Sequence, residues 1–314
     1  MRRNIWIDTD PGIDDAIAIA AAFASTDRLK ICGISTVAGN QTIDIVTDNA
    51  LWLTEALGQE EVSVVRGAEH PLIRKAHPVG RVHGEHGLGY VIPDTPARAL
   101  TSSQGAAFLY RAILNLPEGE KMTLVPIGPL TNIALLLGTF PDIIQRIDQI
   151  VLMGGSAVEG NITATAEYNI WADPEAAEMV FQSGVPIVMC GLDVTMKCLL
   201  TMDEIQRLAK GGALQQKFAR MLEFYFDSTA YQGKGSVAMH DSVPFLYLLH
   251  EEKFSGEHHI VHVSCTEDTC RGMTVICDGA YTYFQTGEPQ NAYVLKDVDA
   301  NWFRQELMER LMSL

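Results

Sequence analysis

The chain has 314 residues, a formal net charge of −16 and 47% hydrophobic residues. Such a chain repels nucleic acid phosphates and anionic membranes, because no run of Lys or Arg provides a local basic patch. No apolar segment is long enough to span a bilayer, and the N-terminus lacks the apolar stretch of a signal peptide. We therefore expect a cytoplasmic protein that binds neither nucleic acid nor membrane.

Four aspartates crowd the end of the first predicted strand. Residues 5–7 form an apolar run typical of a buried strand, and a second apolar run, typical of a helix, follows the aspartates. These aspartates are Asp8, Asp10, Asp14 and Asp15. Pro11 fits the first position of the helix, which puts Asp10 at the N-cap.

Two interpretations fit this acidic cluster. Capping accounts for one or two of the carboxylates, since a helix N-terminus stabilises negative charge. Four carboxylates in a partly buried site repel one another, however, and a hard cation such as Ca²⁺ or Mg²⁺ would relieve that repulsion. The cluster therefore favours a metal site over simple capping.

Strand-like and helical segments alternate along the first 190 residues. Besides 5–7, apolar strands are predicted at 29–37, 62–65, 122–128, 149–153 and 186–190, and helices at 42–57, 104–116, 129–137 and 174–181. Continuous apolar strands between helices are typical of a parallel sheet covered on both faces. We therefore predict an α/β fold, a single domain over residues 1–314 with a mainly parallel central sheet flanked by helices.

Polar or turn residues follow several of these strands, at the sheet edge where ligands bind in such folds. In strand order these residues are Asp8 with Asp10, Asn40, Ile127 with Gly128, Met153 and Asp193. Because the carboxyl ends of parallel strands share one edge, we expect these residues to line a common cleft.

Residues 66–103 show no clear period, and a loop of this length in a compact domain is usually functional or mobile. His83 and His86 lie three residues apart among glycines, which favour a loop over a helix. That spacing is poor for zinc, so a single histidine that reaches into the cleft is the better interpretation.

Residues 154–173 are polar, with a turn at Gly160 and Asn161. Glu167 and Asn169 flank Tyr168 in an extended pattern. The segment fits a solvated loop and fits equally well a set of amide and carboxylate groups that binds the hydroxyls of a sugar.

The remainder is predicted to be mainly helical over 202–250, with a break at 232–235. Asp241 directly precedes an apolar helical run, so it either caps that helix or adds an anionic ligand to a metal site. His240 places a titratable ring beside it. Strands at 258–264, 272–277 and 291–296 and a final helix from residue 301 complete the chain.

Seven motifs resemble those of the nucleoside hydrolases. They are DTDPGIDDA at 8–16, VAGN at 37–40, HGEHGLG at 83–89, LVPIGPLTNIA at 124–134, VLMGG at 151–155, AEYNIWADPEAA at 166–177 and MHD at 239–241. The match looks closest to the bacterial non-specific ribonucleoside hydrolases. It implies a Rossmann-like nucleoside hydrolase fold that hydrolyses purine and pyrimidine ribonucleosides to base and ribose, in a homodimer or homotetramer.

The resemblance also implies site roles. One Ca²⁺ would be held by Asp10, Asp15, Asp241 and the backbone carbonyl of Ile127, with Asp8 behind them. The ribose would contact Asp14, Asn40, Met153, Asn161, Glu167, Tyr168 and Asn169. His83 and His240 would face the base. Tyr168 stands where the family commonly has Phe, and Ile127 where Thr is common.

The expected chemistry follows from the bond that breaks. Cleavage builds positive charge on the ribosyl group, which nearby carboxylates stabilise, while Ca²⁺ orients the sugar and acidifies a water. Asp10 is the expected general base and Asp14 the second choice. His240 is expected to protonate the leaving base, with Tyr231 assisting in a proton relay.

Two other functions fit part of the sequence. A D-x-D motif after a first strand is also the nucleophile motif of haloacid-dehalogenase-type phosphatases, in which Asp8 would attack phosphorus beside Mg²⁺. This chain has Gly12 where that class has Thr or Val, and it lacks the later acidic pair. A non-catalytic nucleoside-binding module would have lost the base or the acid, whereas this chain retains Asp10 and His240. Base preference is not readable from the sequence, because one or two loop residues set it.

Overall fold

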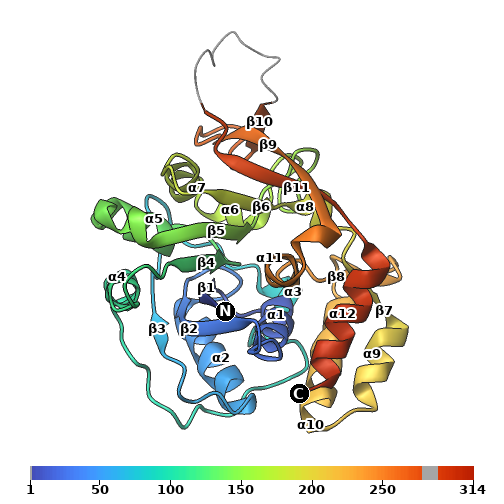
Figure 1. The fold of residues 1–314 in the computed structure, drawn as a ribbon. Helices are drawn as coiled ribbons and strands as arrows, with labels where there is room; N and C mark the ends of the chain where they lie inside the picture. Colours follow the sequence, from blue (N-terminus) through green and yellow to red (C-terminus); the bar gives the residue numbers. More distant parts are fainter. Residues whose placement is uncertain (1, 278–288) are drawn as a thin grey trace.

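The computed structural model describes residues 2–277 and 289–314, which form an α/β fold around one large sheet (Figure 1). The strands of this sheet are β1 (Arg3–Thr9), β2 (Leu29–Thr36), β3 (Val64–Arg66), β4 (Met122–Pro126), β5 (Ile147–Met153), β6 (Ile187–Cys190), β9 (Phe254–Val263), β10 (Thr274–Cys277) and β11 (Ala292–Val298). Their order is β10-β9-β11-β6-β5-β4-β1-β2-β3. All neighbours from β11 to β3 pair in parallel, and β9 pairs antiparallel with β10 and β11. The predicted mainly parallel sheet is therefore confirmed.

Helices cover both faces of this sheet (Figure 1). The α-helices are α1 (Ile13–Phe23), α2 (Ile43–Ala56), α3 (Gly80–His83), α4 (Gly105–Leu114), α5 (Thr131–Thr139), α6 (Tyr168–Ala172), α7 (Pro174–Phe181), α8 (Leu192–Thr195), α9 (Met202–Ala209), α10 (Ala213–Asp227), α11 (Ser242–Leu249) and α12 (Ala300–Met312). Two 3₁₀ turns, η1 (Pro141–Arg146) and η2 (Glu251–Lys253), and a two-stranded antiparallel pair, β7 (Leu199–Thr201) with β8 (Ser236–Ala238), complete the described elements. None of these helices has both the length and the apolar character needed to span a bilayer.

Alternating side chains of β1 fill two separate cores, because successive residues of a strand point to opposite faces. Ile5 and Ile7 belong to the core that α1, α2, α11 and α12 close, whereas Trp6 belongs to the core beneath α4, α5 and α7. All three side chains are fully buried. A strand buried on both faces explains the continuous apolar run in the sequence.

One local prediction was wrong. The first helix does not begin at Pro11: α1 begins at Ile13, and Gly12 rather than Asp10 is its N-cap. The Asp10 carboxylate instead accepts a hydrogen bond from the backbone N–H of Asn40 on the neighbouring loop. The region 202–250 is mainly helical as predicted, and the short strand β8, which pairs with β7, follows the predicted break.

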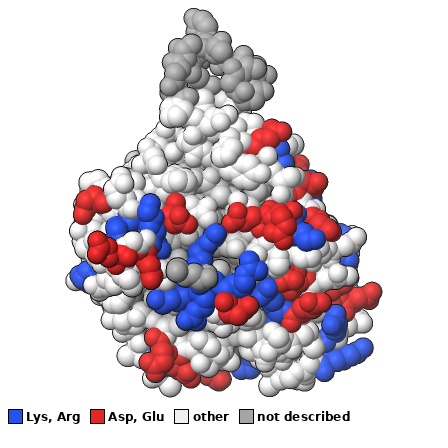
Figure 2. Space-filling view, viewed as in Figure 1, with Lys and Arg blue, Asp and Glu red and all other residues white. Residues whose placement is uncertain are grey.

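The charged side chains are unevenly spread over the face that carries the N-terminus. Figure 2 shows Lys and Arg gathered around the start of the chain and flanked by Asp and Glu. Arg3, for example, pairs with Glu251 at 3.2 Å.

The β1–β2 contact yields a stability prediction. Trp6 pairs with Gly33, and a Cβ at Gly33 would lie 2.3 Å from Cζ3 of the buried indole. Gly33→Ala is expected to lower the free energy of unfolding, measured with urea, by about 1–3 kcal/mol, because the ring has no room to move. Gly138→Ala is the control: its Cβ would meet only the flexible end of Met179 at 3.1 Å. Equal stability of the two variants would contradict the packing argument.

Candidate active site

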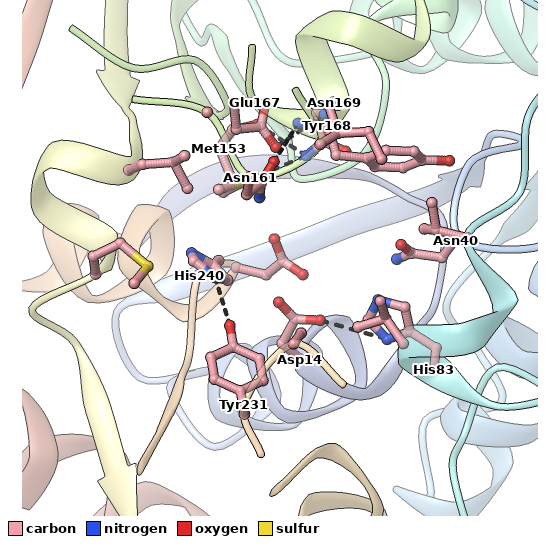
Figure 3. A pocket seen from close by; sticks show the side chains of 18 of the residues that line it. Asp14, Asn40, His83, Met153, Asn161, Glu167, Tyr168, Asn169, Tyr231 and His240 are labelled. Atoms are coloured by element: carbon pink, nitrogen blue, oxygen red, sulfur yellow. Dashed lines mark hydrogen bonds and ion pairs between the residues drawn. The ribbon is translucent and has the colours of Figure 1, made fainter. Parts of the chain in front are cut away.

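A pocket of about 450 Å³ lies at the carboxyl edge of the parallel strands (Figure 3). Every residue predicted to bind substrate lines it: Asp14, Asn40, His83, Met153, Asn161, Glu167, Tyr168, Asn169, Tyr231 and His240. Ile127 and Asp241 line it as well, whereas Asp10 and Asp15 are fully buried next to it. The structure therefore brings the predicted site residues together from segments more than 200 residues apart.

Three carboxylates form the centre of the site. One oxygen from each of Asp14, Asp15 and Asp241 lies within 4.8 Å of the others. Burial, and then the charge of Asp15, raise the pKa of Asp14 to about 8. Burial, and then the charge of Asp14, raise the pKa of Asp241 well above its usual value. These groups ionise together only when a cation compensates their charge. Without a cation, some of them keep their protons.

Asp10 lies beside this cluster in a tight cradle. A Cβ at Gly39 would lie 2.0 Å from Oδ2 of Asp10, and a Cβ at Gly128 would lie 2.5 Å from its Oδ1, so both close approaches require glycine. Oδ2 accepts the Asn40 N–H at 2.6 Å, but Oδ1 has no hydrogen-bond partner. A fully buried carboxylate oxygen without a donor is costly, so this atom is available to a cation.

Asp15 is fixed more completely than Asp10. Its Oδ1 accepts the Thr9 hydroxyl at 2.6 Å, and its Oδ2 accepts the Gly12 N–H at 2.9 Å and the Asn40 side-chain amide at 3.1 Å. Burial still raises its pKa. Asn40 therefore ties the end of β2 to both Asp10 and Asp15.

Asp8 is a structural carboxylate rather than an exposed nucleophile. It is fully buried, does not line the pocket, and its Oδ1 accepts hydrogen bonds from Ser35 and, at 2.7 Å, from Asn132. Burial outweighs these bonds and raises its pKa to about 7. The phosphatase hypothesis needs Asp8 to attack substrate, whereas Ser35 and Asn132 hold one oxygen of this carboxylate.

The predicted extended pattern around Tyr168 was wrong, because Tyr168 begins helix α6 and Glu167 is its N-cap. The Glu167 carboxylate accepts the N–H groups of Gly155, Asn169 and Ile170 at 3.0, 2.9 and 3.2 Å. The Asn169 amide donates to the carbonyl of Ile127 at 2.9 Å. This cap places Glu167, Asn169 and Asn161 on one side of the cavity, opposite Asp14 and Tyr231 (Figure 3).

The Tyr168 hydroxyl links this side of the pocket to the loop before α3. It lies 2.7 Å from the carbonyl oxygen of Gly39 and 3.1 Å from that of His77. A phenylalanine at this position would lack both contacts. The loop then continues into α3, which supplies Val82 and His83 to the pocket wall.

The other end of the pocket is aromatic. His83 is buried and accepts the Ile13 N–H at 3.1 Å through Nδ1, and its ring packs on Tyr225 with centroids 5.5 Å apart. His86 is exposed, which agrees with the poor zinc spacing inferred from the sequence. Burial, and then the charge of His240, lower the pKa of His83 to about 3.

A chain of hydrogen bonds connects this aromatic end to the carboxylates. His240 lies between the Thr195 hydroxyl, 2.8 Å from Nδ1, and the Tyr231 hydroxyl, 2.9 Å from Nε2. Tyr231 reaches Tyr225 at 3.5 Å, and Tyr225 donates to Asp14 at 3.5 Å. Burial, and then the charge of Lys234, lower the pKa of His240 to about 4. The ring is therefore neutral at pH 7.

Sequence reasoning missed several members of this site. Thr195, Tyr225 and Lys234 carry no local pattern that separates them from ordinary helix or loop residues. Tyr225 lies in the apolar run of α10, where an aromatic residue predicts only core packing. The one usable signal was the break around Lys234, which interrupts a helical region.

The donor set fits a hard cation. The cluster of Asp14, Asp15 and Asp241 and the neighbouring Asp10 offer oxygen ligands from buried carboxylates, and one of these atoms, Oδ1 of Asp10, lacks a partner. Such sites suit Ca²⁺ or Mg²⁺ rather than zinc. Asp241 was predicted to be either a helix cap or a metal ligand. It is the N-cap residue of α11, but its side chain makes no capping hydrogen bond, so its carboxylate remains available as a ligand.

Comparisons with known proteins agree with this geometry. The family model described as inosine-uridine preferring nucleoside hydrolase matches residues 5–305. The pyrimidine-specific ribonucleoside hydrolase RihA of Shewanella woodyi is 41% identical over 99% of this chain and 98% of its own length. The RihA of Photobacterium profundum is 40% identical over the full length of both chains.

Solved structures give the same result. A plant nucleoside hydrolase superposes with a TM-score of 0.91 at 27% identity and covers all of both chains. The purine-preferring ribonucleoside hydrolase from Gardnerella vaginalis superposes with a TM-score of 0.90 at 30% identity, over 99% of this chain and 98% of that one.

The raised carboxyl pKa values predict how stability depends on pH. A carboxyl whose pKa is raised on folding stabilises the protein below its unfolded pKa, and that contribution is lost as pH rises through the folded pKa. Between about pH 4 and pH 8, the free energy of unfolding of chelator-treated protein should therefore fall, since Asp8 and Asp14 have pKa values of about 7 and 8. Added Ca²⁺ should raise Tm more at pH 8 than at pH 5.5. A Ca²⁺-induced shift in Tm that is the same at pH 5.5 and pH 8 would contradict a cation site formed by carboxylates with raised pKa values.

Proposed function

This chain belongs to the inosine-uridine preferring nucleoside hydrolase family, and we propose that it uses one Ca²⁺ to hydrolyse the N-glycosidic bond of purine and pyrimidine ribonucleosides. Hydrolysis of ribonucleosides to free base and ribose is the activity of the family. The observation that carries the assignment to this chain is the mixed lining of its pocket. Carboxylate and amide side chains line it together with histidine and tyrosine rings. The carboxylates and amides suit the hydroxyls of a ribose, and the rings suit a planar base.

We assign the Ca²⁺ site to Asp10, Asp15, Asp241 and the carbonyl oxygen of Ile127. The unpartnered Oδ1 of Asp10 and the raised pKa of Asp241 support this set. Asp14 lies close enough to Asp15 and Asp241 to contribute to the same negative charge. When bound, Ca²⁺ would act as a Lewis acid that orients the sugar hydroxyls and lowers the pKa of a water.

The sugar-binding residues prepare the ribosyl group for cleavage. Asp14, Asn40 and Asn169 offer acceptors and donors to its hydroxyls, and Glu167 and Asn161 extend this surface along the cavity. Positive charge grows on the ribosyl group as the C–N bond lengthens. The surrounding carboxylates stabilise that charge without rearranging, which lowers the barrier to cleavage.

Asp10 is our choice of general base and Asp14 the alternative. The cradle of Gly39 and Gly128 fixes the Asp10 carboxylate, and the Asn40 N–H occupies its Oδ2. Held in this way beside the proposed cation site, the Asp10 carboxylate is the group that we propose takes a proton from the attacking water.

His240 is our choice of general acid. Because its pKa of about 4 keeps the ring neutral at pH 7, it acts as a relay: the ring gives one proton toward the base as its other nitrogen takes up a proton that solvent supplies. The Thr195 hydroxyl is hydrogen-bonded to Nδ1 of His240, and the Tyr231 hydroxyl is hydrogen-bonded to Nε2. Tyr231 lines the pocket. Tyr231 thus carries the proton toward the departing base.

The names of relatives do not agree on the base. RihA relatives are called pyrimidine-specific, whereas a solved relative at 30% identity is called purine-preferring. A binding module without turnover is the remaining alternative, which the presence of both Asp10 and His240 disfavours. We further propose that residues 1–314 form one domain, and that the enzyme is a cytoplasmic homodimer or homotetramer, as for other members of the family.

Release of free ribose tests the function directly. Purified, Ca²⁺-loaded protein is expected to release ribose from inosine, adenosine, uridine or cytidine without added phosphate. The relative rates give the base preference. Absence of ribose from all four substrates, with ligand binding intact, would identify a binding module instead.

Asp10→Asn tests the general base. The amide is nearly the same size but takes up no proton, so kcat is expected to fall by at least about 10³-fold while the fold is retained. Thermal unfolding and circular dichroism check the fold. Near-normal turnover would exclude Asp10 and shift the role to Asp14, which Asp14→Asn then tests.

His240→Ala tests the general acid. The loss of kcat is expected to be about 10²-fold or more on uridine and much smaller on 4-nitrophenyl riboside, whose leaving group departs without a proton. Equal losses on the two substrates would contradict an acid role.

A further inference from the structure

Lys234 brings a positive charge to the aromatic end of the pocket. It lies in the turn between α10 and β8, flanked by Gly233 and Gly235, which both adopt left-handed backbone with φ of 79° and 78°. Among the described residues that line the pocket, Lys234 is the one lysine or arginine. Its Nζ lies 5.5 Å from the centroid of the Tyr231 ring.

Two observations show that this ammonium is available to a ligand. Within the described part of the chain it makes no ion pair with a carboxylate, and its Nζ lies over the face of the Tyr231 ring. A Cβ at either neighbouring glycine would meet nothing within 4 Å, so no packing encloses the turn. Lys234 is itself exposed and lines the pocket, so a ligand in the pocket can approach the ammonium.

The proposed reaction creates a need for such a charge. When the bond between C1′ and the base nitrogen breaks, its electron pair stays with the base, and the water oxygen forms the new bond to C1′. One water proton goes to the general base, and the departing base gains a proton from the acid. Until that proton arrives, the base carries negative charge, which the carboxylate end of the pocket does not stabilise.

We propose that the Lys234 ammonium contacts the departing base and stabilises its negative charge, and so is a further catalytic residue of this enzyme. The inference rests on the proposed function. A cation that acts on charge developed only in the transition state raises kcat more than it lowers KM. The position of Lys234 beside Tyr231 puts it at the end of the pocket where the proton is delivered.

Lys234 and His240 both line the pocket, so the charge of the ammonium acts on the same cavity as the proposed acid. The ammonium is exposed, so its effect is screened by salt and is smaller than that of a buried cation.

Removing the charge while keeping a long side chain tests the proposal. Lys234→Met is expected to lower kcat on uridine about tenfold, equivalent to about 1.4 kcal/mol, with KM changed by less than about threefold. On 4-nitrophenyl riboside, whose leaving group is already a stable anion, the loss should be about twofold or less. Equal losses on both substrates, or an unchanged kcat on uridine, would overturn the proposal.

Lys234→Arg and Lys217→Met are the matched controls. Arginine keeps the charge, so Lys234→Arg should retain kcat on uridine within about threefold. A loss as large as that of Lys234→Met would overturn an electrostatic role. Lys217 also stacks on an aromatic ring, Trp52, with Nζ 4.9 Å from its centroid, but it does not line the pocket. Lys217→Met should therefore leave the ratio of kcat on uridine to kcat on 4-nitrophenyl riboside unchanged. If Lys217→Met lowers this ratio as much as Lys234→Met does, the effect is not specific to the pocket and the proposal is overturned.

The wild-type protein separates this proposal from the proposed function. If wild-type protein releases no ribose, the function itself is wrong. If wild-type protein releases ribose and Lys234→Met does so at the same rate, the function stands and the role of Lys234 is wrong.

Discussion

Mutual repulsion among buried carboxylates is the constraint on which the rest of this structure depends. Asp10, Asp14, Asp15 and Asp241 are all buried, and burial raises the pKa of each. Such an arrangement is unfavourable alone and becomes favourable when a cation compensates the charge. The neighbouring backbone and amide donors lower the cost only in part. The enzyme therefore keeps at its centre a group of charges that is useful because it is incompletely neutralised.

The hydrogen bonds around this cluster divide it into fixed and available atoms. Asn40 and Thr9 donate hydrogen bonds to oxygens of Asp10 and Asp15. The Glu167 carboxylate accepts N–H groups at the N-terminus of α6. Asp14 and Asp241 line the pocket, and Oδ1 of Asp10 is left without a hydrogen-bond partner. Catalytic sites depend on this kind of rigid support, since small displacements of reacting groups cost much of the rate.

Most of the fold was predictable because apolar strands buried on both faces leave a clear pattern, as in β1 and β5. The site was predictable where residues follow those strands or match the family motifs. Local geometry was harder. Asp10 looked like an N-cap because only the sequence neighbours of α1 were visible, whereas its real partner, Asn40, comes from the loop after β2. Thr195 and Tyr225 became site residues only through tertiary contacts with His240 and Asp14, which no periodicity encodes.

The position of Asp241 in the sequence has a consequence for the order in which the protein folds. Asp14 and Asp15 leave the ribosome among the first residues, but the carboxylate that completes their cluster arrives more than 200 residues later, just before α11 packs on α1. The early sheet β1-β2-β4 can therefore assemble without the full electrostatic strain of the finished centre. The cost falls on the later step in which Asp241 docks. Cation uptake at that step would make this docking, rather than the pairing of β1, β2 and β4, sensitive to the ionic composition of the surroundings.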